Sequence, residues 1–300
     1  MRVFLTGGTG NVGRAVLSEL LRRGHEVIAL VRRELPDIAG YRPVTGDLAR
    51  IKDVMAEVAM ADAIIHCATP RGLKRPQVLQ EDIEATGVLL DAWSRGSFVY
   101  MSSQTVYGVP QGVLEETSPL APANWYDLGK ICNEHQLAMA AAHPRRTGVA
   151  LRLPLVFAAG PRRRDRQFLP LIHEALHDGK TFLFGSEDAI ASHGTVFIGE
   201  ADLGRAAADA LTLSESGAYN LASGFCTWHE LIACMGRHCR IEPRFTVRAA
   251  AAAVPGEFPL PRSRSFYDCT RFAELARFAP MQSLDEVIGG FVAAEHRGAA

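Results

Sequence analysis

The glycine-rich stretch LTGGTGNVGR near the N-terminus constrains the fold more than any other feature of this chain. Gly7, Gly10 and Gly13 follow the spacing G-x-x-G-x-x-G, between an apolar run and a helical pattern. Glycine adopts positive φ in tight turns and lets backbone approach a ligand closely. The helix starting near Asn11 would point free N–H groups and its positive end at whatever lies over the turn. The pattern predicts a pyrophosphate-binding turn, with a ligand-free structural turn as the alternative.

The first half of the chain alternates strand-like and helix-like segments. Runs that are apolar nearly throughout lie at residues 2–7, 26–31, 42–48, 62–68, 97–103 and 149–154, with helical patterns between most of them. Such runs are typical of parallel strands buried on both faces. The alternation predicts an α/β fold, a Rossmann-like doubly wound parallel sheet covered by helices on both faces.

The pattern changes after about residue 156. We expect residues 1–156 to form a dinucleotide-binding Rossmann domain, to which the chain returns near residues 196–222. Residues 157–195 and 223–300 are expected to form a smaller, mostly helical C-terminal substrate-binding lobe. Within this lobe, TWHELIACMGRHC has the periodicity of one amphipathic helix. Its histidines and cysteines fit no usual zinc spacing, so we expect no metal site there.

Composition and charge argue against several classes of partner. The 300 residues carry a net charge of −1, which gives no overall field to attract nucleic acid or an anionic membrane. No apolar run approaches the roughly 20 residues of a membrane span. None of the six cysteines forms a C-x-x-C pair. The N-terminus lacks the long apolar segment of a secretion signal, so a cytoplasmic location is the default expectation.

The end of the second expected strand indicates the type of cofactor. EVIALV is followed by Arg32 and Arg33, and no carboxylate occurs before Glu34. An NAD site usually ends this strand with Asp or Glu, which binds the ribose hydroxyls. A guanidinium instead suits a 2′-phosphate. The arginines therefore favour NADP over NAD, with a merely solvated strand end as the alternative. Asp47, after the third strand, is predicted to contact the adenine edge.

A candidate proton-transfer pair lies in WYDLGK. Tyr126 and Lys130 are four residues apart, which places both on one face of a helix. Tyrosine is a poor base because its unperturbed pKa is about 10, but a neighbouring ammonium stabilises the phenolate. We therefore expect Tyr126 to exchange a proton with a substrate oxygen, assisted by Lys130. MSSQTVYG ends the fifth strand, where doubly wound folds place their chemistry, and a serine there can hydrogen-bond the reacting oxygen.

These segments occur in a characteristic order. TGGTGNVG, GDL, HCAT, MSSQTVYG and WYDLGK together resemble the extended short-chain dehydrogenase/reductase group, also called the NAD-dependent epimerase/dehydratase family. The resemblance covers about residues 1–225 and implies a nicotinamide cofactor that exchanges a hydride with a substrate carbon. It assigns catalysis to Ser103, Tyr126 and Lys130. The expected cofactor-binding residues are Gly7, Gly10, Asn11, Val12, Gly13, Arg32, Arg33, Asp47, Leu48, Cys67, Ala68, Thr69, Ser102, Tyr126, Lys130 and Pro154.

The chain also departs from the family's patterns. Gln104 and Thr105 stand where 4,6-dehydratases carry Asp-Glu, which argues against that elimination of water. Leu155 replaces an Asn, and Thr195 an Arg, that nucleotide-sugar members often carry. Two missing polar anchors weaken the case for a nucleotide-sugar substrate. The arginine run at residues 162–166 is interpreted as a solvated loop, with an anion site as the alternative.

Three functions remain open. The first is an NADP-dependent oxidoreductase acting on a secondary alcohol or ketone of a small, sugar-like or polyketide-like substrate. The second is a sugar or nucleotide-sugar epimerase that uses bound NAD(P). The third is an NADP-sensing binding protein without catalysis, which the presence of Tyr126 and Lys130 disfavours. Many relatives form homodimers through the helix that carries the Tyr, and the apolar stretch HQLAMAAAH is compatible with that arrangement.

Overall fold

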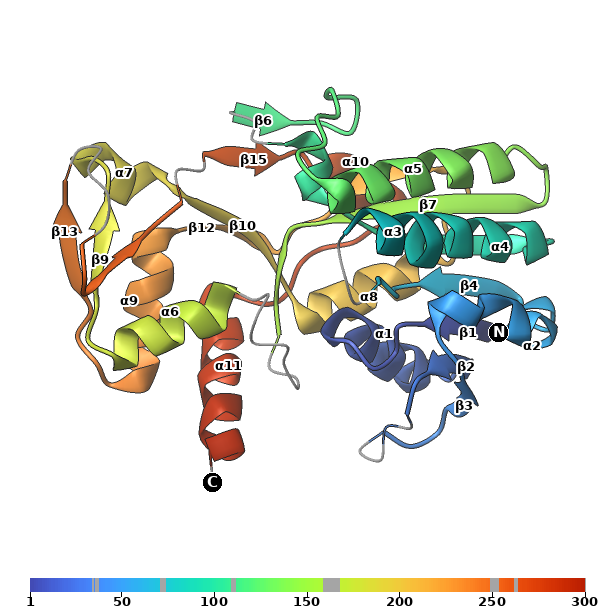
Figure 1. Cartoon of the computed structure of the whole chain (residues 1–300), viewed down its shortest axis with the longest axis horizontal. Helices are drawn as coiled ribbons and strands as arrows, with labels where there is room; N and C mark the ends of the chain where they lie inside the picture. Colours follow the sequence, from blue (N-terminus) through green and yellow to red (C-terminus); the bar gives the residue numbers. More distant parts are fainter. Residues whose placement is uncertain are drawn as a thin grey trace.

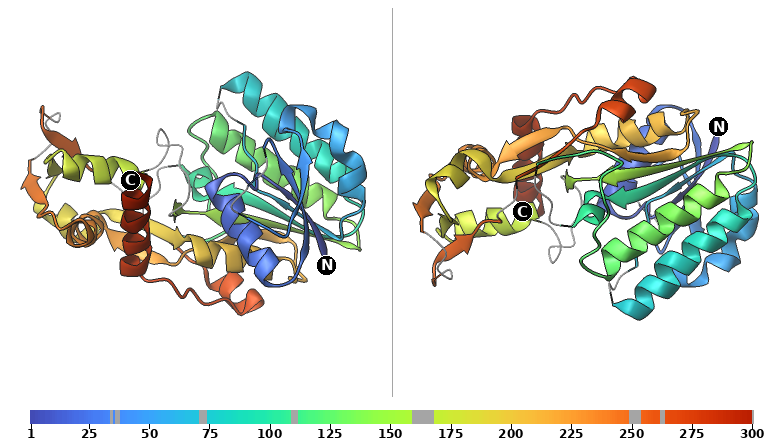
Figure 2. Two further views of the ribbon diagram at one scale, coloured as in Figure 1. Left: turned by 90° about the horizontal axis from the view of Figure 1, so that it is seen from below. Right: turned by 90° about the horizontal axis from the view of Figure 1, so that it is seen from above.

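The structure is a computed structural model that describes residues 1–33, 35, 38–70, 74–108, 112–158, 168–248, 254–261 and 264–299. Figure 1 shows two parts, a large sheet flanked by helices and a smaller part built mainly from residues after 155. The two views in Figure 2 show helices on both faces of the large sheet.

The large sheet has seven strands, all paired in parallel, in the order β11-β7-β5-β4-β1-β2-β3. The strands are β1 (Arg2–Thr6), β2 (Glu26–Val31), β3 (Arg42–Thr45), β4 (Ala63–His66), β5 (Gly96–Ser103), β7 (Arg146–Leu153) and β11 (Gly217–Asn220). The strand order reverses at β1, which is the usual ligand-binding point of a doubly wound sheet. The predicted Rossmann-like fold is confirmed.

Alternate side chains of β1 face two separate cores. Val3 and Leu5 pack with α1 and α8, whereas Phe4 packs with α4 and α5 on the other face. The helices on the two faces are α1 (Asn11–Arg22), α8 (Glu200–Ala210), α4 (Ala85–Ala92) and α5 (Trp125–Ala140). Burial on both faces explains why the strands are apolar without alternation.

Helical patterns at residues 51–59 and 76–94, between the third and fourth and between the fourth and fifth expected strands, predict one helix each, and the structure divides both into segments. The pattern at residues 51–59 becomes a 3₁₀ segment η1 (Leu48–Val54) followed by α2 (Met55–Ala59). The pattern at residues 76–94 becomes α3 (Arg75–Val78), a π-helical turn η2 (Leu79–Glu84) and α4. Segments of one or two turns are too short for apolar spacing to separate 3₁₀, π and α helices. A π turn often marks a functional site, and this one carries the fully buried Asp82.

The smaller part contains two three-stranded sheets that the sequence did not predict, in the orders β12-β10-β8 and β13-β9-β14. Their strands are β8 (Leu155–Phe157), β10 (Gly194–Gly199), β12 (Gly224–Thr227), β9 (Thr181–Phe184), β13 (Arg244–Val247) and β14 (Glu257–Pro259). Within the returning stretch 196–222, α8 and β11 belong to the large sheet's layers, whereas β10 pairs with β8 and β12. A further pair joins β6 (Gly112–Leu114) to β15 (Ser265–Tyr267).

The remaining helices are α6 (Phe168–His177), α7 (Glu187–Ser192), α9 (Trp228–Cys239), α10 (Thr270–Ala276) and α11 (Leu284–Ala299). The prediction of one helix over TWHELIACMGRHC is confirmed by α9, which covers Trp228–Cys239. A capping box formed by Thr227 and Glu230 fixes its start. A second apolar core packs α6, α9 and α11 against β9. Within the described ranges, no helix combines the length and apolar character that a membrane span requires.

Asp202 fastens α8 to the segment that leads into α11. Its buried carboxylate accepts hydrogen bonds from Ser223 Oγ at 2.7 Å, from the Met281 N–H at 3.0 Å and from the Gln282 N–H at 3.1 Å. Arg205 forms a salt bridge to it at 2.5 Å. Burial alone would raise the pKa of Asp202, but these donors outweigh burial and lower the pKa below its ordinary value.

We predict that Asp202→Asn lowers the free energy of unfolding by about 3 kcal/mol near pH 7, because an NH₂ group would face several donors inside the protein. The lowered pKa of Asp202 means that its contribution is present above about pH 4 and is lost as the pH falls further. Urea unfolding of the wild type and of Asp202→Asn should therefore show a difference in the free energy of unfolding that becomes smaller as the pH is lowered.

The matched control for this prediction is Asp209→Asn on the same helix. Asp209 pairs with Arg23 at 2.6 Å in a partly exposed position, so its loss should cost about 1 kcal/mol or less. Equal costs for the two variants, or a gap that stays constant down to about pH 3, would contradict the role assigned to Asp202.

Candidate active site

The predicted glycine turn connects β1 to α1 and is closely packed. Gly7 has φ +74°, and a Cβ built there would lie 2.6 Å from the Ala68 nitrogen on the neighbouring chain after β4. A Cβ on Gly13 would lie 2.1 Å from the carbonyl oxygen of Gly7. No side chain fits at either position, so the turn requires glycine for its own packing.

Gly10 differs from these two glycines. A Cβ there would have one neighbour within 4 Å, the Gly7 oxygen at 3.5 Å, so packing within the chain does not require glycine. Gly10 is the N-cap of α1, and the first turn of that helix carries no acidic side chain. The open side of Gly10 and the positive end of α1 form a cradle that fits a pyrophosphate.

The other expected cofactor contacts follow the C-terminal ends of neighbouring parallel strands. Arg32 and Arg33 follow β2 and are exposed, and Asp47 between β3 and η1 is also exposed. Cys67, Ala68 and Thr69 follow β4, and Leu48 is buried at the start of η1. Because the strands are parallel, these positions share one edge of the sheet with the glycine turn. Glu34 and the arginine run at 162–166 lie outside the described residues.

His66 holds the ends of β1 and β4 together beside the turn. Its Nδ1 lies 2.5 Å from the Thr6 hydroxyl and its Nε2 lies 3.1 Å from the Thr86 hydroxyl. Complete burial lowers the pKa of His66 to about 3, with a further contribution from the nearby Lys130 charge. The ring is therefore a neutral structural group that positions the backbone under the cradle.

The predicted catalytic residues come from β5 and α5. Ser103 is the last residue of β5, and its Oγ lies 3.0 Å from the Thr105 hydroxyl. Lys130 Nζ donates to the Met101 carbonyl at 3.0 Å and lies 5.4 Å from the centre of the Tyr126 ring. Tyr126 is half-buried, whereas Lys130 is 1% exposed. The ammonium is thus fixed next to the Tyr126 ring, as the spacing predicted.

A layer of buried polar groups surrounds Lys130. Asn133 Nδ2 bonds both Asp82 Oδ1 and the Tyr100 hydroxyl at 2.9 Å, and Lys130 Nζ lies 4.7 Å from the centre of the Tyr100 ring. Burial alone would lower the pKa of Lys130, but the oxygens of Tyr100, Tyr126 and Asp82 outweigh it and the pKa is raised. The side chain therefore stays protonated beside Tyr126.

A second buried network fixes α5 to the sheet. Arg152 of β7 and Glu134 of α5 form an ion pair at 2.7 Å in which both side chains are almost fully buried. Ser102 donates to Glu134 at 2.5 Å, and Arg152 also donates to the Tyr107 hydroxyl at 2.7 Å. The Ser102 hydroxyl is thus engaged by Glu134 within the protein. The predicted cofactor contact of Ser102 would therefore be made by its main chain.

A pocket of about 250 Å³ lies beside Ser103. Leu155, Thr195 and Pro154 line it, together with Tyr267 of β15. Leu155 and Thr195 are the two positions where the sequence lacks the polar anchors of nucleotide-sugar members. Among the described residues that line this pocket, none carries a charge. The pocket can accept a small neutral molecule next to the Ser103 hydroxyl.

Sequence reasoning missed the polar groups behind the predicted catalytic residues. Asn133 and Glu134 follow Lys130 at helical spacings of three and four, on the buried face of α5. Arg152 is a buried charge among the otherwise apolar residues 149–153 of β7. Charged or amide side chains at core positions need partners, so these positions were a usable signal for a buried network.

We predict that Gly10→Ala weakens binding of the dinucleotide at least about tenfold while leaving the thermal midpoint nearly unchanged. The added methyl group meets little of the protein but projects to the open side of the turn. Gly8→Ala is the matched control, because its Cβ would make ordinary contacts of 3.6–4.0 Å with Leu5, Leu17 and Ala29. Titration calorimetry measures both affinities, and equal affinities would contradict the placement of the pyrophosphate over Gly10.

The chain has sequence relatives with different activities. It is 28% identical over 176 residues to a decarboxylating sterol-4-alpha-carboxylate 3-dehydrogenase of Dictyostelium discoideum, covering 52% of this chain and 54% of that protein. It is 29% identical over 255 residues to a UDP-glucose 4-epimerase of Corynebacterium glutamicum, covering 75% of this chain and 76% of that protein. The chain therefore spans little more than half the length of the first of these relatives.

A solved structure and a family model match the fold described above. The structure of MoeE5 in complex with UDP-glucose and NAD has a TM-score of 0.82 and 22% sequence identity, covering 100% of both chains, which shows the same fold. The model of the NAD dependent epimerase/dehydratase family matches residues 3–222, which include the glycine turn, Ser103, Tyr126 and Lys130. The chain therefore belongs to the NAD-dependent epimerase/dehydratase family of enzymes.

Proposed function

We propose that this enzyme is an NADP-dependent oxidoreductase that interconverts a secondary alcohol and a ketone on a small substrate without a diphosphate group. The observation that carries the proposal is the position of Ser103. It ends β5 next to α5, which carries Tyr126 and Lys130, and it lines a pocket whose described residues carry no charge.

The cofactor contacts divide between the turn and the end of β2. Gly10 and the N–H groups at the start of α1 hold the pyrophosphate, and the exposed Arg32 and Arg33 hold a 2′-phosphate. When bound, the nicotinamide supplies the hydride donor or acceptor. The fit rests on the cradle that a Cβ at Gly10 would partly fill and on the absence of an acidic side chain in the first turn of α1.

The protein's own groups perform the proton transfer. In the reducing direction the Ser103 hydroxyl donates to the substrate carbonyl oxygen and orients it. The Tyr126 hydroxyl gives its proton to the same oxygen, and the protonated Lys130 stabilises the phenolate that remains. In the oxidising direction Tyr126 takes the proton from the alcohol. The Met101 carbonyl keeps the Lys130 ammonium in place throughout.

The pocket supports a substrate without phosphate groups. A diphosphate carries negative charge that needs arginine, lysine or a cluster of backbone donors when it leaves water. The described lining offers the hydroxyls of Thr105, Thr195 and Tyr267 and the apolar side chains of Leu153 and Leu155. This combination suits a neutral ketone or alcohol with an apolar part.

A sugar epimerase is the second candidate, because the UDP-glucose 4-epimerase of Corynebacterium glutamicum is similar over 75% of this chain. Epimerisation would use the same Ser103, Tyr126 and Lys130. Epimerisation differs from net oxidation or reduction because the hydride returns to the substrate, so no coenzyme is consumed. A homodimer and a cytoplasmic location stay predictions from the sequence.

The function is tested by following NADPH absorbance with a panel of neutral ketones and with UDP-glucose. We expect ketone-dependent oxidation of NADPH and no conversion of UDP-glucose. Tyr126→Phe should lower kcat by about 100-fold or more because the proton donor is lost, while the affinity for NADPH is kept. Tyr219→Phe is the matched control. The Tyr219 hydroxyl donates to the Glu215 carbonyl just before β11, and Tyr219 is not among the described residues that line the pocket.

Two results would contradict the proposal. Full activity in Tyr126→Phe would remove the assigned proton donor. Conversion of UDP-glucose without net change in NADPH would favour the epimerase instead.

We predict that Arg32→Glu raises the KM for NADPH by about tenfold or more and leaves the KM for NADH unchanged or lower. The reason is that a carboxylate repels a 2′-phosphate and can bind the free ribose hydroxyls of NADH. Arg95→Ala, at the opposite end of the sheet, serves as a control for general loss of positive charge. Steady-state kinetics with both coenzymes measure the effect, and an unchanged preference would contradict the contact between Arg32 and the 2′-phosphate.

A further inference from the structure

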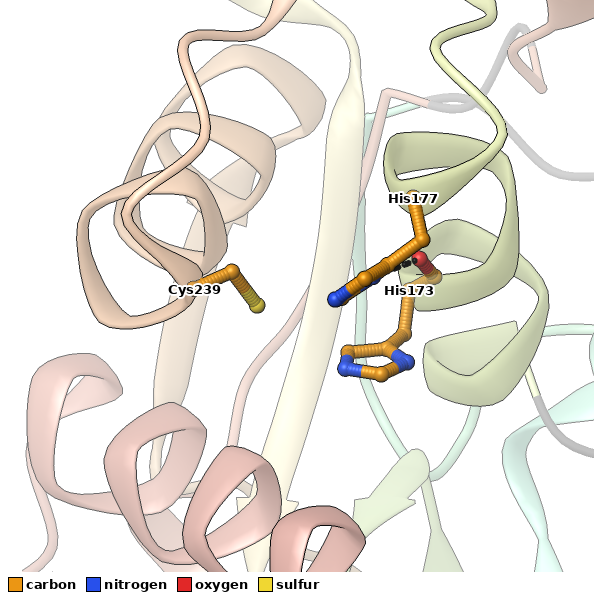
Figure 3. A group of neighbouring side chains, drawn as sticks. All are labelled: His173, His177 and Cys239. Carbon is orange, nitrogen blue, oxygen red and sulfur yellow. Dashed lines mark hydrogen bonds between the residues drawn. The ribbon is translucent and has the colours of Figure 1, made fainter. Parts of the chain in front are cut away.

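A group of potential metal ligands lies in the smaller part of the molecule, among residues that no catalytic role uses. His173 and His177 lie on α6, and Cys239 is the last residue of α9. One ligand atom of each side chain lies within 4.8 Å of the other two. Figure 3 shows the cysteine directed from its helix toward the two imidazole rings. Some 60 residues separate the two helical sites in the sequence, so no local spacing could reveal the group.

The His177 ring is oriented by a hydrogen bond. Its Nδ1 lies 2.9 Å from the His173 carbonyl oxygen, drawn as a dashed line in Figure 3. A carbonyl can only accept, so Nδ1 carries the proton and Nε2 of the neutral ring keeps its lone pair. Fixing one ring nitrogen by a backbone carbonyl, and thereby presenting the other, is the arrangement found around metal-binding histidines. The two imidazole centres lie 4.2 Å apart.

The ends of two helices make this place favourable for a cation. His177 ends α6 and Cys239 ends α9, so both ligand side chains stand on the last turn of their helix. The C-terminal end of a helix carries a partial negative charge, which stabilises a positive ion nearby. This electrostatic preference is independent of the ligand atoms themselves.

The ligand set indicates which ion would bind. Two imidazoles and one thiolate suit Zn²⁺ and related borderline ions, with bonds of about 2.0–2.1 Å to nitrogen and about 2.3 Å to sulfur. Tetrahedral binding would bring the ligand atoms to about 3.3–3.6 Å from one another. The longest separation therefore has to shorten by about 1.5 Å at most, which small side-chain rotations achieve. Burial raises the pKa of the Cys239 thiol, so binding a metal would release its proton.

A second group, Cys234, His238 and Asp285, is a useful contrast. Its carboxylate already accepts from the Arg237 guanidinium at 3.2 Å and from the Cys234 thiol at 3.5 Å. His238 Nε2 lies 3.3 Å from the same oxygen. The Arg237 guanidinium and two further hydrogen bonds already occupy the Asp285 carboxylate, so this group is a poor metal site. Its residues provide matched control variants.

We propose that His173, His177 and Cys239 bind a zinc-type divalent ion that links the C-terminal ends of α6 and α9. With three protein ligands, the fourth position is left for water. The ion acts as a cross-link in the core shared by α6, α9 and α11, where His173 already contacts the ring of Phe291. This inference revises the sequence expectation of no metal, which considered only histidines and cysteines near one another in the chain.

The test is titration of the chelator-treated full chain with Co²⁺, which substitutes for Zn²⁺ and reports its ligands by colour. We expect saturation at one ion per chain, with a thiolate charge-transfer band and the strong visible bands of a tetrahedral site. Zn²⁺ should displace the Co²⁺ and raise the thermal midpoint. Cys239→Ser should abolish the charge-transfer band, and His177→Gln should weaken binding by about tenfold or more.

Cys234→Ser is the matched control and should keep both the band and the affinity. His177 is exposed, so His177→Gln tests the site even if Cys239→Ser affects folding. The proposal is overturned if no band forms, or if the band survives in Cys239→Ser and disappears in Cys234→Ser. None of these measurements depends on the oxidoreductase activity.

Discussion

The contact between the Gly13 backbone and the Gly7 carbonyl oxygen is the constraint on which the rest of the site depends. A Cβ at Gly13 would lie 2.1 Å from that oxygen, so α1 can begin this close to β1 only without a side chain there. The same turn touches the chain after β4 through Gly7. Parallel pairing then carries the ends of β2 and β5 to the same edge. Gly10, Arg32 and Ser103 therefore lie at one edge of the sheet because of backbone packing.

Buried charge fixes the second half of the site. Lys130 bonds the Met101 carbonyl, and Glu134 accepts from Ser102, so α5 is attached to two consecutive residues that precede Ser103 on β5. Removing one partner of a buried ion pair typically costs about 3–5 kcal/mol, which makes the Glu134–Arg152 pair intolerant of change. These bonds set the position of the helix that carries Tyr126, the proposed proton donor. The catalytic geometry is thus a property of the α5–sheet interface.

The sequence predicted the parts of the molecule whose causes are local. The glycine spacing and the apolar runs sufficed for a doubly wound parallel sheet, and four-residue spacing sufficed for Lys130 on the same helix face as Tyr126. It did not predict the two small sheets, because their strands are three to six residues long and pair across roughly 30 to 75 positions. It did not predict the polar layer around Lys130, because Asp82, Tyr100 and Asn133 come from three separate elements.

The central claim is tested most directly by a crystal structure of the enzyme with NADP⁺. The account predicts the pyrophosphate over Gly10, the 2′-phosphate against Arg32, and the reactive carbon of the nicotinamide on the side where the hydroxyls of Ser103 and Tyr126 converge. An empty crevice at saturating coenzyme would contradict it. So would a bound coenzyme with Ser103 and Tyr126 directed away from each other.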